Sequence, residues 1–221
     1  MVPKISKQEM KQVDEEVPEK YGIDTNRLME NAGLRAAEFI RQKIEGRHIT
    51  VYAGKGNNGG DALVVARRLH LWNYEVEIVL ASRDLKGIQK EELDILDKLG
   101  VEINEESSEN DYRIALDGLL GYGISGNPRP PYNSMIEEIN AHETIVSVDI
   151  PTGLNPDTGE KMIDCIDPGF TVTLGLPFKG MNKENSGDIW VADIGIPSEV
   201  YSNPEKSSIF NQKSLVQLQN N

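Results

Sequence analysis

The chain has 221 residues, 36 of them acidic and 23 basic, which gives a formal net charge of −13 at pH 7. This length suits one domain with a sizeable core, and the negative charge disfavours polyanions such as nucleic acids as partners. A single cysteine, Cys165, excludes an intrachain disulfide and fits a reducing compartment. Because the sequence has no apolar signal region and no apolar run long enough to span a bilayer, we expect a cytoplasmic protein without a membrane segment.

Two helical patterns open the chain. Residues 6–20 have the apolar spacing of an amphipathic helix, and residues 23–44 form a longer pattern that Asp24 or Thr25 can cap. The apolar stripe of the second helix is typical of a core surface or of a dimer contact.

The segment from residue 48 to residue 70 predicts a strand, a glycine-rich loop and a helix. An apolar β-rich run over 49–53 precedes the glycines, and helical spacing begins at residue 62. The glycines allow positive φ and a close approach to a ligand, so the loop can hold a phosphate. They are Gly54, Gly56, Gly59 and Gly60.

Two familiar phosphate motifs fit this loop poorly. The glycines satisfy G-x-G-x-x-G, but the next expected strand, residues 75–80, lacks the acidic residue that binds ribose in dinucleotide dehydrogenases. Gly60 and Asp61 stand where a P-loop has Lys and Ser or Thr. Asp61 also reads as an N-cap, in which case a ligand must contact the loop amides or Asn57 and Asn58. These two Asn residues offer more donors and acceptors than a turn needs.

Strands and helices alternate along the rest of the chain. The expected elements are a helix over 85–99, a short extended piece over 101–103, a solvated loop over 105–111, a strand from 114 to Asp117, a loop rich in Gly and Pro, a helix from residue 132, a strand from 144 to Asp149, and strands over 171–176 and 189–194.

This alternation predicts the α/β class, as a three-layer α/β/α Rossmann-like sandwich with a mainly parallel central sheet. We expect a single domain over 1–221. Within it, 1–45 hold the N-terminal helices, 48–200 form the Rossmann-like core, and 201–221 are a polar tail.

Ligands of such sheets bind beyond the carboxyl ends of the strands, an edge that should gather the Asn-Gly loop, Asp117, Asp149, Thr152 and Lys179. No His lies in these loops, which disfavours Ser-His-Asp and Cys-His catalysis. Each Asp reads either as a turn former or as a partly desolvated carboxylate that exchanges protons with a ligand. For a metal, the oxygen donors of Asn58, Asp117 and Thr152 suit a monovalent cation better than Mg²⁺, unless they only hydrogen-bond the loops together.

Five segments, in order, resemble the NAD(P)H-hydrate epimerase family, the YjeF amino-terminal domain. The combination of NNGGD, D-G-L-x-G-x-G and D-I-P-S/T-G is specific, and the segments span most of the chain. They are DTNRLMENAG, AGKGNNGGDALVVARRL, LDGLLGYGISG, VSVDIPTGLNPDTG and TVTLGLPFKG.

The resemblance implies a stand-alone isomerase that interconverts the R and S epimers of hydrated NADH and NADPH, damaged cofactors with water added at C6 of the nicotinamide ring. It implies one K⁺ per subunit, bound by Asn58, Asp117 and Thr152, and a homodimer that works with a separate NAD(P)H-hydrate dehydratase. An Asp/Lys pair is adequate for the proton transfers; the candidates are Asp149 and, as our own addition, Lys179, whose alternative is a solvated loop lysine. The residues implied to hold the hydrated dinucleotide are Asn57, Asn58, Gly59, Gly60 and Asp61, then Gly121, Tyr122, Gly123, Ile124, Ser125, Gly126 and Asn127, and Asp149.

Two other functions compete with this interpretation. Related domains serve as scaffolds in messenger RNA decapping and as lipoprotein-binding proteins, so the alternative is a non-catalytic nucleotide-binding or scaffold domain of the same fold. The acidic charge and the complete strand-end motifs argue against a scaffold. An ordinary NAD(P) dehydrogenase is disfavoured because the ribose-binding acid is absent.

Overall fold

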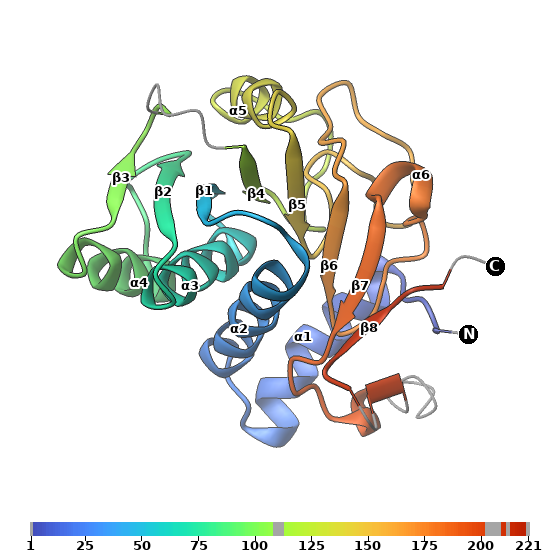
Figure 1. Ribbon diagram of the computed structural model, residues 1–221. Helices are drawn as coiled ribbons and strands as arrows, with labels where there is room; N and C mark the ends of the chain where they lie inside the picture. The colour runs from blue at the N-terminus through green and yellow to red at the C-terminus, as the bar shows by residue number, and fades with distance from the viewer. Residues whose placement is uncertain (1, 108–112, 202–208, 211–212, 220–221) are drawn as a thin grey trace.

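A computed structural model describes residues 2–107, 113–201, 209–210 and 213–219. They form one eight-stranded sheet with helices on both faces, as Figure 1 shows, so the predicted α/β sandwich is confirmed. The elements in chain order are α1 (Lys7–Tyr21), α2 (Thr25–Lys43), β1 (His48–Ala53), α3 (Asn57–Leu71), β2 (Glu75–Leu80), α4 (Gly87–Lys98), β3 (Glu102–Asn104), β4 (Ile114–Gly118), α5 (Tyr132–Ile139), β5 (Thr144–Val148), β6 (Phe170–Leu174), α6 (Lys183–Ser186), β7 (Asp188–Ala192), the 3₁₀ helix η1 (Ser198–Val200) and β8 (Leu215–Gln217).

The sheet is parallel except at one edge. Its strand order is β3-β2-β1-β4-β5-β6-β7-β8, and only β8 pairs antiparallel with its neighbour. The chain therefore builds outward from β1 to β3 and then continues from β4 in the opposite direction. Such a reversal, here between β1 and β4, is the place where open α/β sheets bind ligands beyond the strand ends.

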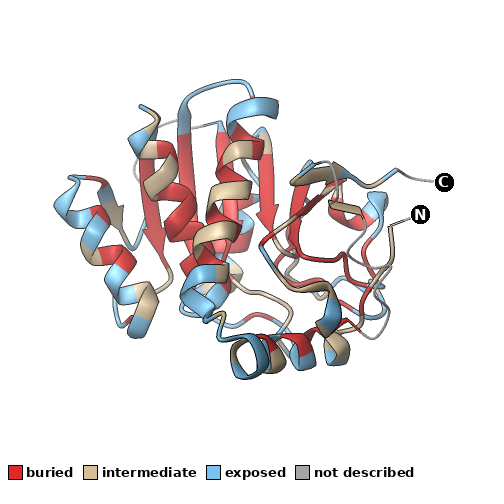
Figure 2. Ribbon diagram, turned by 90° about the horizontal axis from the view of Figure 1, so that it is seen from below, coloured by how far each residue is buried: buried red, intermediate tan, exposed pale blue. Residues whose placement is uncertain are grey.

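Side-chain alternation along the strands separates two cores. Val51, Ile78 and Leu116 face helices α2 and α3, whereas Tyr52 and Ala115 face α5 on the other side. The central strands are buried along most of their length (Figure 2), which explains their continuous apolar runs in the sequence.

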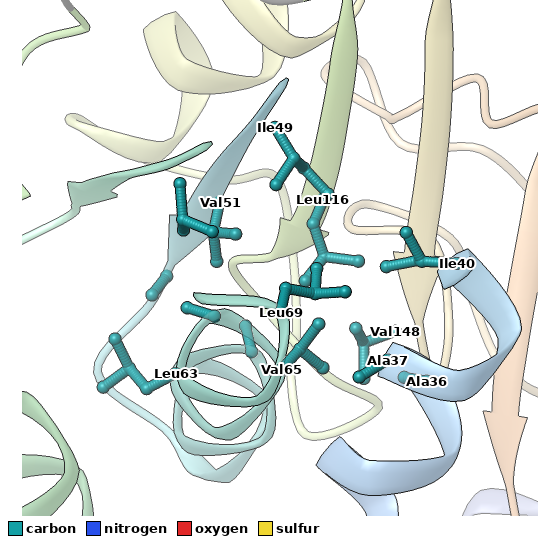
Figure 3. Packing of buried hydrophobic residues seen from close by; sticks show 14 of the residues in the cluster. Ala36, Ala37, Ile40, Ile49, Val51, Leu63, Val65, Leu69, Leu116 and Val148 are labelled. Atoms are coloured by element: carbon teal, nitrogen blue, oxygen red, sulfur yellow. The ribbon is translucent and has the colours of Figure 1, made fainter. Parts of the chain in front are cut away.

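The apolar stripe of α2 belongs to the larger of these cores. Figure 3 shows Ile40 of α2 in one cluster with Leu69 of α3 and Leu116 of β4. Phe39 is completely buried, and its ring centroid lies 5.5 Å from that of Trp190 in β7. The stripe is therefore a core surface, and the alternative interpretation as a dimer contact is wrong.

Helix α1 lies over the carboxyl edge of the sheet. Its apolar residues Met10, Val13 and Val17 pack in a cluster with residues that follow β5 and β6, among them Leu176 and Phe178. The apolar spacing predicted over 6–20 is thus confirmed, and it places a helix next to the edge where a ligand is expected.

The remaining expectations concern a helix cap, the tail, a loop and a membrane segment. Of the two caps that the sequence offered for α2, Asp24 is the one observed, and its side chain accepts a hydrogen bond from the backbone N–H of Arg27. The region predicted as a polar tail also contributes a strand to the sheet, because β8 pairs with β7. Of the predicted loop over 105–111, residues 108–111 lie outside the described residues. Within the described ranges, no helix is long and apolar enough to cross a membrane.

Candidate active site

A cavity of about 760 Å³ lies at the carboxyl edge of the sheet. Its walls come from α1, α2, the start of α3, the loop after β4, the end of β6 and the segments that follow β5 and β7. Three carboxylates and two ammonium groups line it, whereas the remaining wall is largely apolar. The charged residues are Lys7, Lys11, Asp14, Asp61 and Asp149. This volume is in the range of pockets that hold a small-molecule ligand or cofactor.

Helix α3 begins at the cavity, earlier than its sequence predicts. Its first residue is Asn57 and its N-cap is Gly56, so Asp61 lies inside the helix and is not the predicted cap. Among the described residues, no side chain caps this helix. The backbone N–H groups of the first turn and the positive end of the helix dipole therefore remain available to an anion in the cavity.

The glycines of this motif serve the packing of α3. A Cβ on Gly59 would lie 1.9 Å from the carbonyl oxygen of Gly54, and a Cβ on Gly54 would lie 1.8 Å from that of Leu119. None of the four loop glycines has a positive φ, so that part of the expectation is wrong. Gly59 and Gly60 are buried and do not line the cavity. Gly59 lets the helix lie against the backbone after β1, whereas a Cβ on Gly60 would meet the side chain of Met29 in α2.

Asp117 and Thr152 are hydrogen-bonded to each other at the carboxyl edge of the sheet. The two Asp117 oxygens accept four hydrogen bonds, from Thr152 Oγ1 (2.7 Å), Ser147 Oγ (2.8 Å), Thr152 N (2.9 Å) and Leu119 N (3.2 Å). Burial raises the pKa of Asp117, while these donors oppose that shift. The pair thus joins the loops after β4 and β5, which is the structural role that the sequence left open.

Asn58 differs from these two residues because its amide is unsatisfied. The side chain is 6% exposed, and neither its oxygen nor its nitrogen has a hydrogen-bond partner among the described residues. A buried amide without partners is costly, so its oxygen is a free ligand for a cation or a bound molecule. No group of three or more His, Cys, Asp or Glu side chains suited to a metal occurs in the described part of the chain.

Asp149 follows β5 and faces the cavity with an unusual backbone, at φ 65°. One carboxylate oxygen accepts a hydrogen bond of 3.3 Å from the backbone N–H of Leu174. Burial raises the pKa of Asp149 to about 7, with a smaller contribution from the charge of Asp14, while the Leu174 donor opposes the shift. The group is therefore able to give and to take a proton near neutral pH.

The other cavity carboxyls are shifted in the same direction. Burial raises the pKa of Asp61, and the charges of Asp149 and Asp14 add to this effect. Burial also raises the pKa of Asp14, although a hydrogen bond from the Tyr122 hydroxyl opposes it. Several perturbed carboxyls around one cavity are typical of a functional site.

Only some of the residues predicted in the loop after β4 line the cavity. Gly121, Tyr122, Gly123 and Ile124 line the cavity, whereas Ser125, Gly126 and Asn127 do not. The Asn127 side chain instead accepts a hydrogen bond of 3.1 Å from the backbone N–H of Ile163.

Lys179 is also not among the residues that line the cavity. Its ammonium group forms an ion pair with Glu9 of α1 at 2.9 Å. Its predicted role in proton transfer gains no support from this position.

Sequence reasoning missed the contribution of α1, which places Lys7, Met10, Lys11 and Asp14 in the cavity wall. A usable signal was present, because Asp14 lies at i+4 from Met10 and at i−3 from Val17, on the apolar face of the helix. An acidic residue on an apolar face is a reason to look for a polar cavity beside it.

Comparisons with known proteins agree with the resemblance. The model of the family described as YjeF-related protein N-terminus matches residues 25–180. The NAD(P)H-hydrate epimerase of Cenarchaeum symbiosum is 37% identical over 208 residues, which cover 85% of this chain and 97% of that protein. The bifunctional NAD(P)H-hydrate repair enzyme Nnr of Archaeoglobus fulgidus is 38% identical over 81% of this chain, but the match covers only 39% of its length.

The fold has a counterpart among solved structures. The crystal structure of the yeast protein ynu0 superposes with a TM-score of 0.81 and covers 98% of this chain and 100% of its own, at 24% sequence identity. At that identity the likeness concerns the fold alone.

Proposed function

We propose, on the premise that this chain belongs to the family of YjeF-related protein N-termini, that it is an NAD(P)H-hydrate epimerase and hence an isomerase of hydrated NADH and NADPH. The chain spans about two fifths of the length of the bifunctional relatives, but nearly all of a stand-alone epimerase. The observation that carries the proposal is a carboxyl with a pKa of about 7, Asp149, in a cavity that also holds the open N-terminus of α3.

The start of α3 suits the anionic part of a dinucleotide. The diphosphate of the hydrated cofactor can accept hydrogen bonds from the free N–H groups of the first turn, next to Asn57 and Gly56. The apolar wall, which includes Met10 and Leu28, then receives the less polar parts of the ligand. This arrangement needs no ribose-binding acid after β2, and so it accounts for the absence of the dehydrogenase pattern.

Asp149 supplies the acid–base chemistry. Epimerisation at C6 breaks and remakes a bond at that carbon, and a proton must leave the substrate and return to it. A carboxyl with a pKa near 7 is present in both protonation states at neutral pH, so one group can serve both directions.

We propose K⁺ as the ion of this site, held by Asn58, Asp117 and Thr152. The unsatisfied amide oxygen of Asn58 fits a cation ligand, and the buried Asp117 carboxylate would supply negative charge. When bound, K⁺ would supply positive charge that offsets the anionic ligand. A cytoplasmic location, a homodimer and a separate dehydratase as pathway partner are further parts of the proposal, and the bifunctional relatives, which are named repair enzymes, support the last of these.

The test is chromatographic. Separated R-hydrate of NADPH is incubated with the folded protein in KCl, and conversion to the S form is compared with the spontaneous rate. We expect clear acceleration that falls by at least about 100-fold in Asp149→Asn, since a positioned acid–base group contributes roughly that much. Asp97→Asn, which makes the same charge change on the exposed end of α4, should keep the wild-type rate.

The outcome also decides between the two candidate functions. If the folded wild-type protein gives no acceleration in KCl, a nucleotide-binding or scaffold domain becomes the better account. If both Asp variants retain full activity, the chain is an epimerase but Asp149 is not its acid–base group.

A further inference from the structure

Helix α1 forms part of the cavity although it lies outside the region matched by the family model, which begins at residue 25. It contributes a carboxylate, Asp14, that lines the cavity. This carboxylate accepts a hydrogen bond from the hydroxyl of Tyr122, 108 residues further along the chain.

The side chain of Tyr122 is thereby held at both ends. Its ring packs against Phe178 with a centroid distance of 5.4 Å and an interplanar angle of 41°. Its hydroxyl is fixed by Asp14, and the residue itself lines the cavity in the loop after β4. A second bond from α1 to this loop, from Lys7 Nζ to the carbonyl oxygen of Ile124 at 3.2 Å, holds the loop backbone nearby.

The attachment of α1 does not require Asp14. Met10, Val13 and Val17 are each 4% exposed or less in the apolar cluster beneath the helix. The segment before the helix is also bound, because Ile5 exchanges backbone hydrogen bonds of 2.9 Å with the chain on both sides of Phe178. Because other contacts hold α1 in place, the hydrogen bond between Asp14 and Tyr122 is not needed for that purpose and can serve the cavity instead.

We propose that Asp14 is a positioning residue of the epimerase site, which holds the ring of Tyr122 as a fixed wall for the substrate beside Asp149. The inference rests on the proposed function. Asp14 and Tyr122 line the same cavity as Asp149, so this wall faces the space that a ligand of that carboxyl occupies. A rigid aromatic surface packs against a ring of the ligand at low entropic cost, because few side-chain torsions remain to be fixed.

The experiment removes each partner of the bond in turn and measures epimerisation of hydrated NADPH. Asp14→Ala removes the acceptor and Tyr122→Phe removes the donor while it keeps the ring. We expect each variant to raise KM about tenfold with kcat changed less than about threefold, since the wall contacts ground state and transition state alike. The double variant should be no worse than either single one, because both lose the same bond.

Two further variants separate positioning from charge and from folding. Asp14→Asn removes the charge but keeps a side-chain carbonyl that can accept a hydrogen bond from the Tyr122 hydroxyl. Its KM should therefore lie much closer to that of the wild type than the KM of Asp14→Ala does. Glu19→Gln, an exposed change of charge on the same helix, should match the wild type. A loss of folded protein lowers the apparent kcat and leaves KM unchanged, and so it cannot imitate the expected result.

The failures of the two proposals are distinct. An inactive wild-type protein overturns the epimerase function itself. An active wild type whose KM is unchanged in Asp14→Ala and Tyr122→Phe overturns only the positioning role, as does a double variant whose effects multiply.

Discussion

The backbone of Asp149 lies in the left-handed region, which few residues other than Gly, Asn and Asp adopt readily. Its carboxyl is also held at a pKa of about 7, mainly by burial. Local strain and a shifted carboxyl at one residue beside a cavity indicate a position kept for function, because neither feature favours folding.

The shifted carboxyl predicts a pH dependence of stability. An unfolded Asp has a pKa of about 3.9, so between pH 4 and pH 7 the folded protein binds the extra proton and loses stability as the pH rises. Asp149→Asn removes this loss and tolerates the same φ. Its free energy of unfolding should exceed that of the wild type by about 1–3 kcal/mol above pH 7.5, with the difference shrinking toward pH 4. Urea titrations at several pH values measure it; a difference independent of pH would contradict the assigned shift.

Thr152 gives a second prediction at the scale of one residue. Its fully buried hydroxyl donates to Asp117 and accepts a hydrogen bond of 3.0 Å from the backbone N–H of Leu120. Thr152→Val keeps the volume but removes one of the four donors to the buried Asp117 carboxylate and leaves the backbone N–H of Leu120 without its acceptor, so it should cost about 2 kcal/mol of unfolding free energy. Thr152→Ser keeps the hydroxyl and should cost about 1 kcal/mol or less. Equal losses in urea unfolding would show that packing, not hydrogen bonding, decides this position.

Among the elements, the parallel strands and most helices could be predicted because their patterns are local. The strand over 75–80 agrees with β2 at both ends, and the fold class follows from the alternation. The start of α3 could not be found in this way. Asn and Gly are weak helix formers, so local propensity places Asn57–Gly60 in a loop, whereas packing against the strand ends makes it the first turn of the helix.

The site was predictable where a motif ends a strand, as at Asp149, and not where it depends on distant packing. Asp14 reaches the cavity only because α1 folds back over the carboxyl edge. The strand β8 was missed for a similar reason, since three residues in a polar stretch become a strand only through pairing with β7.

The start of α3 predicts losses of very different size at two glycines, Gly59 in its first turn and Gly56 at its N-cap. Gly59→Ala places a Cβ 1.9 Å from a backbone carbonyl oxygen, which cannot move away cheaply, so we expect a loss of at least about 3 kcal/mol. Gly56→Ala meets nothing within 4 Å and has a φ of −88°, so it should cost less than about 1 kcal/mol, the preference for Gly over Ala at an N-cap. Thermal unfolding of both variants tests this; similar melting temperatures would refute the helical first turn.

For the whole molecule, the net charge of −13 means that any salt stabilises the fold by screening self-repulsion. A K⁺ site must therefore appear as a higher free energy of unfolding in KCl than in LiCl at equal ionic strength. At a K⁺ concentration ten times its dissociation constant, linkage gives about 1.4 kcal/mol. Asn58→Ala should lose only this ion-specific part, whereas Asn26→Ala, exposed on α2, should keep it. If melting temperatures in the two salts coincide for the wild type, the unsatisfied Asn58 amide serves the organic ligand, and the cation is not part of the site.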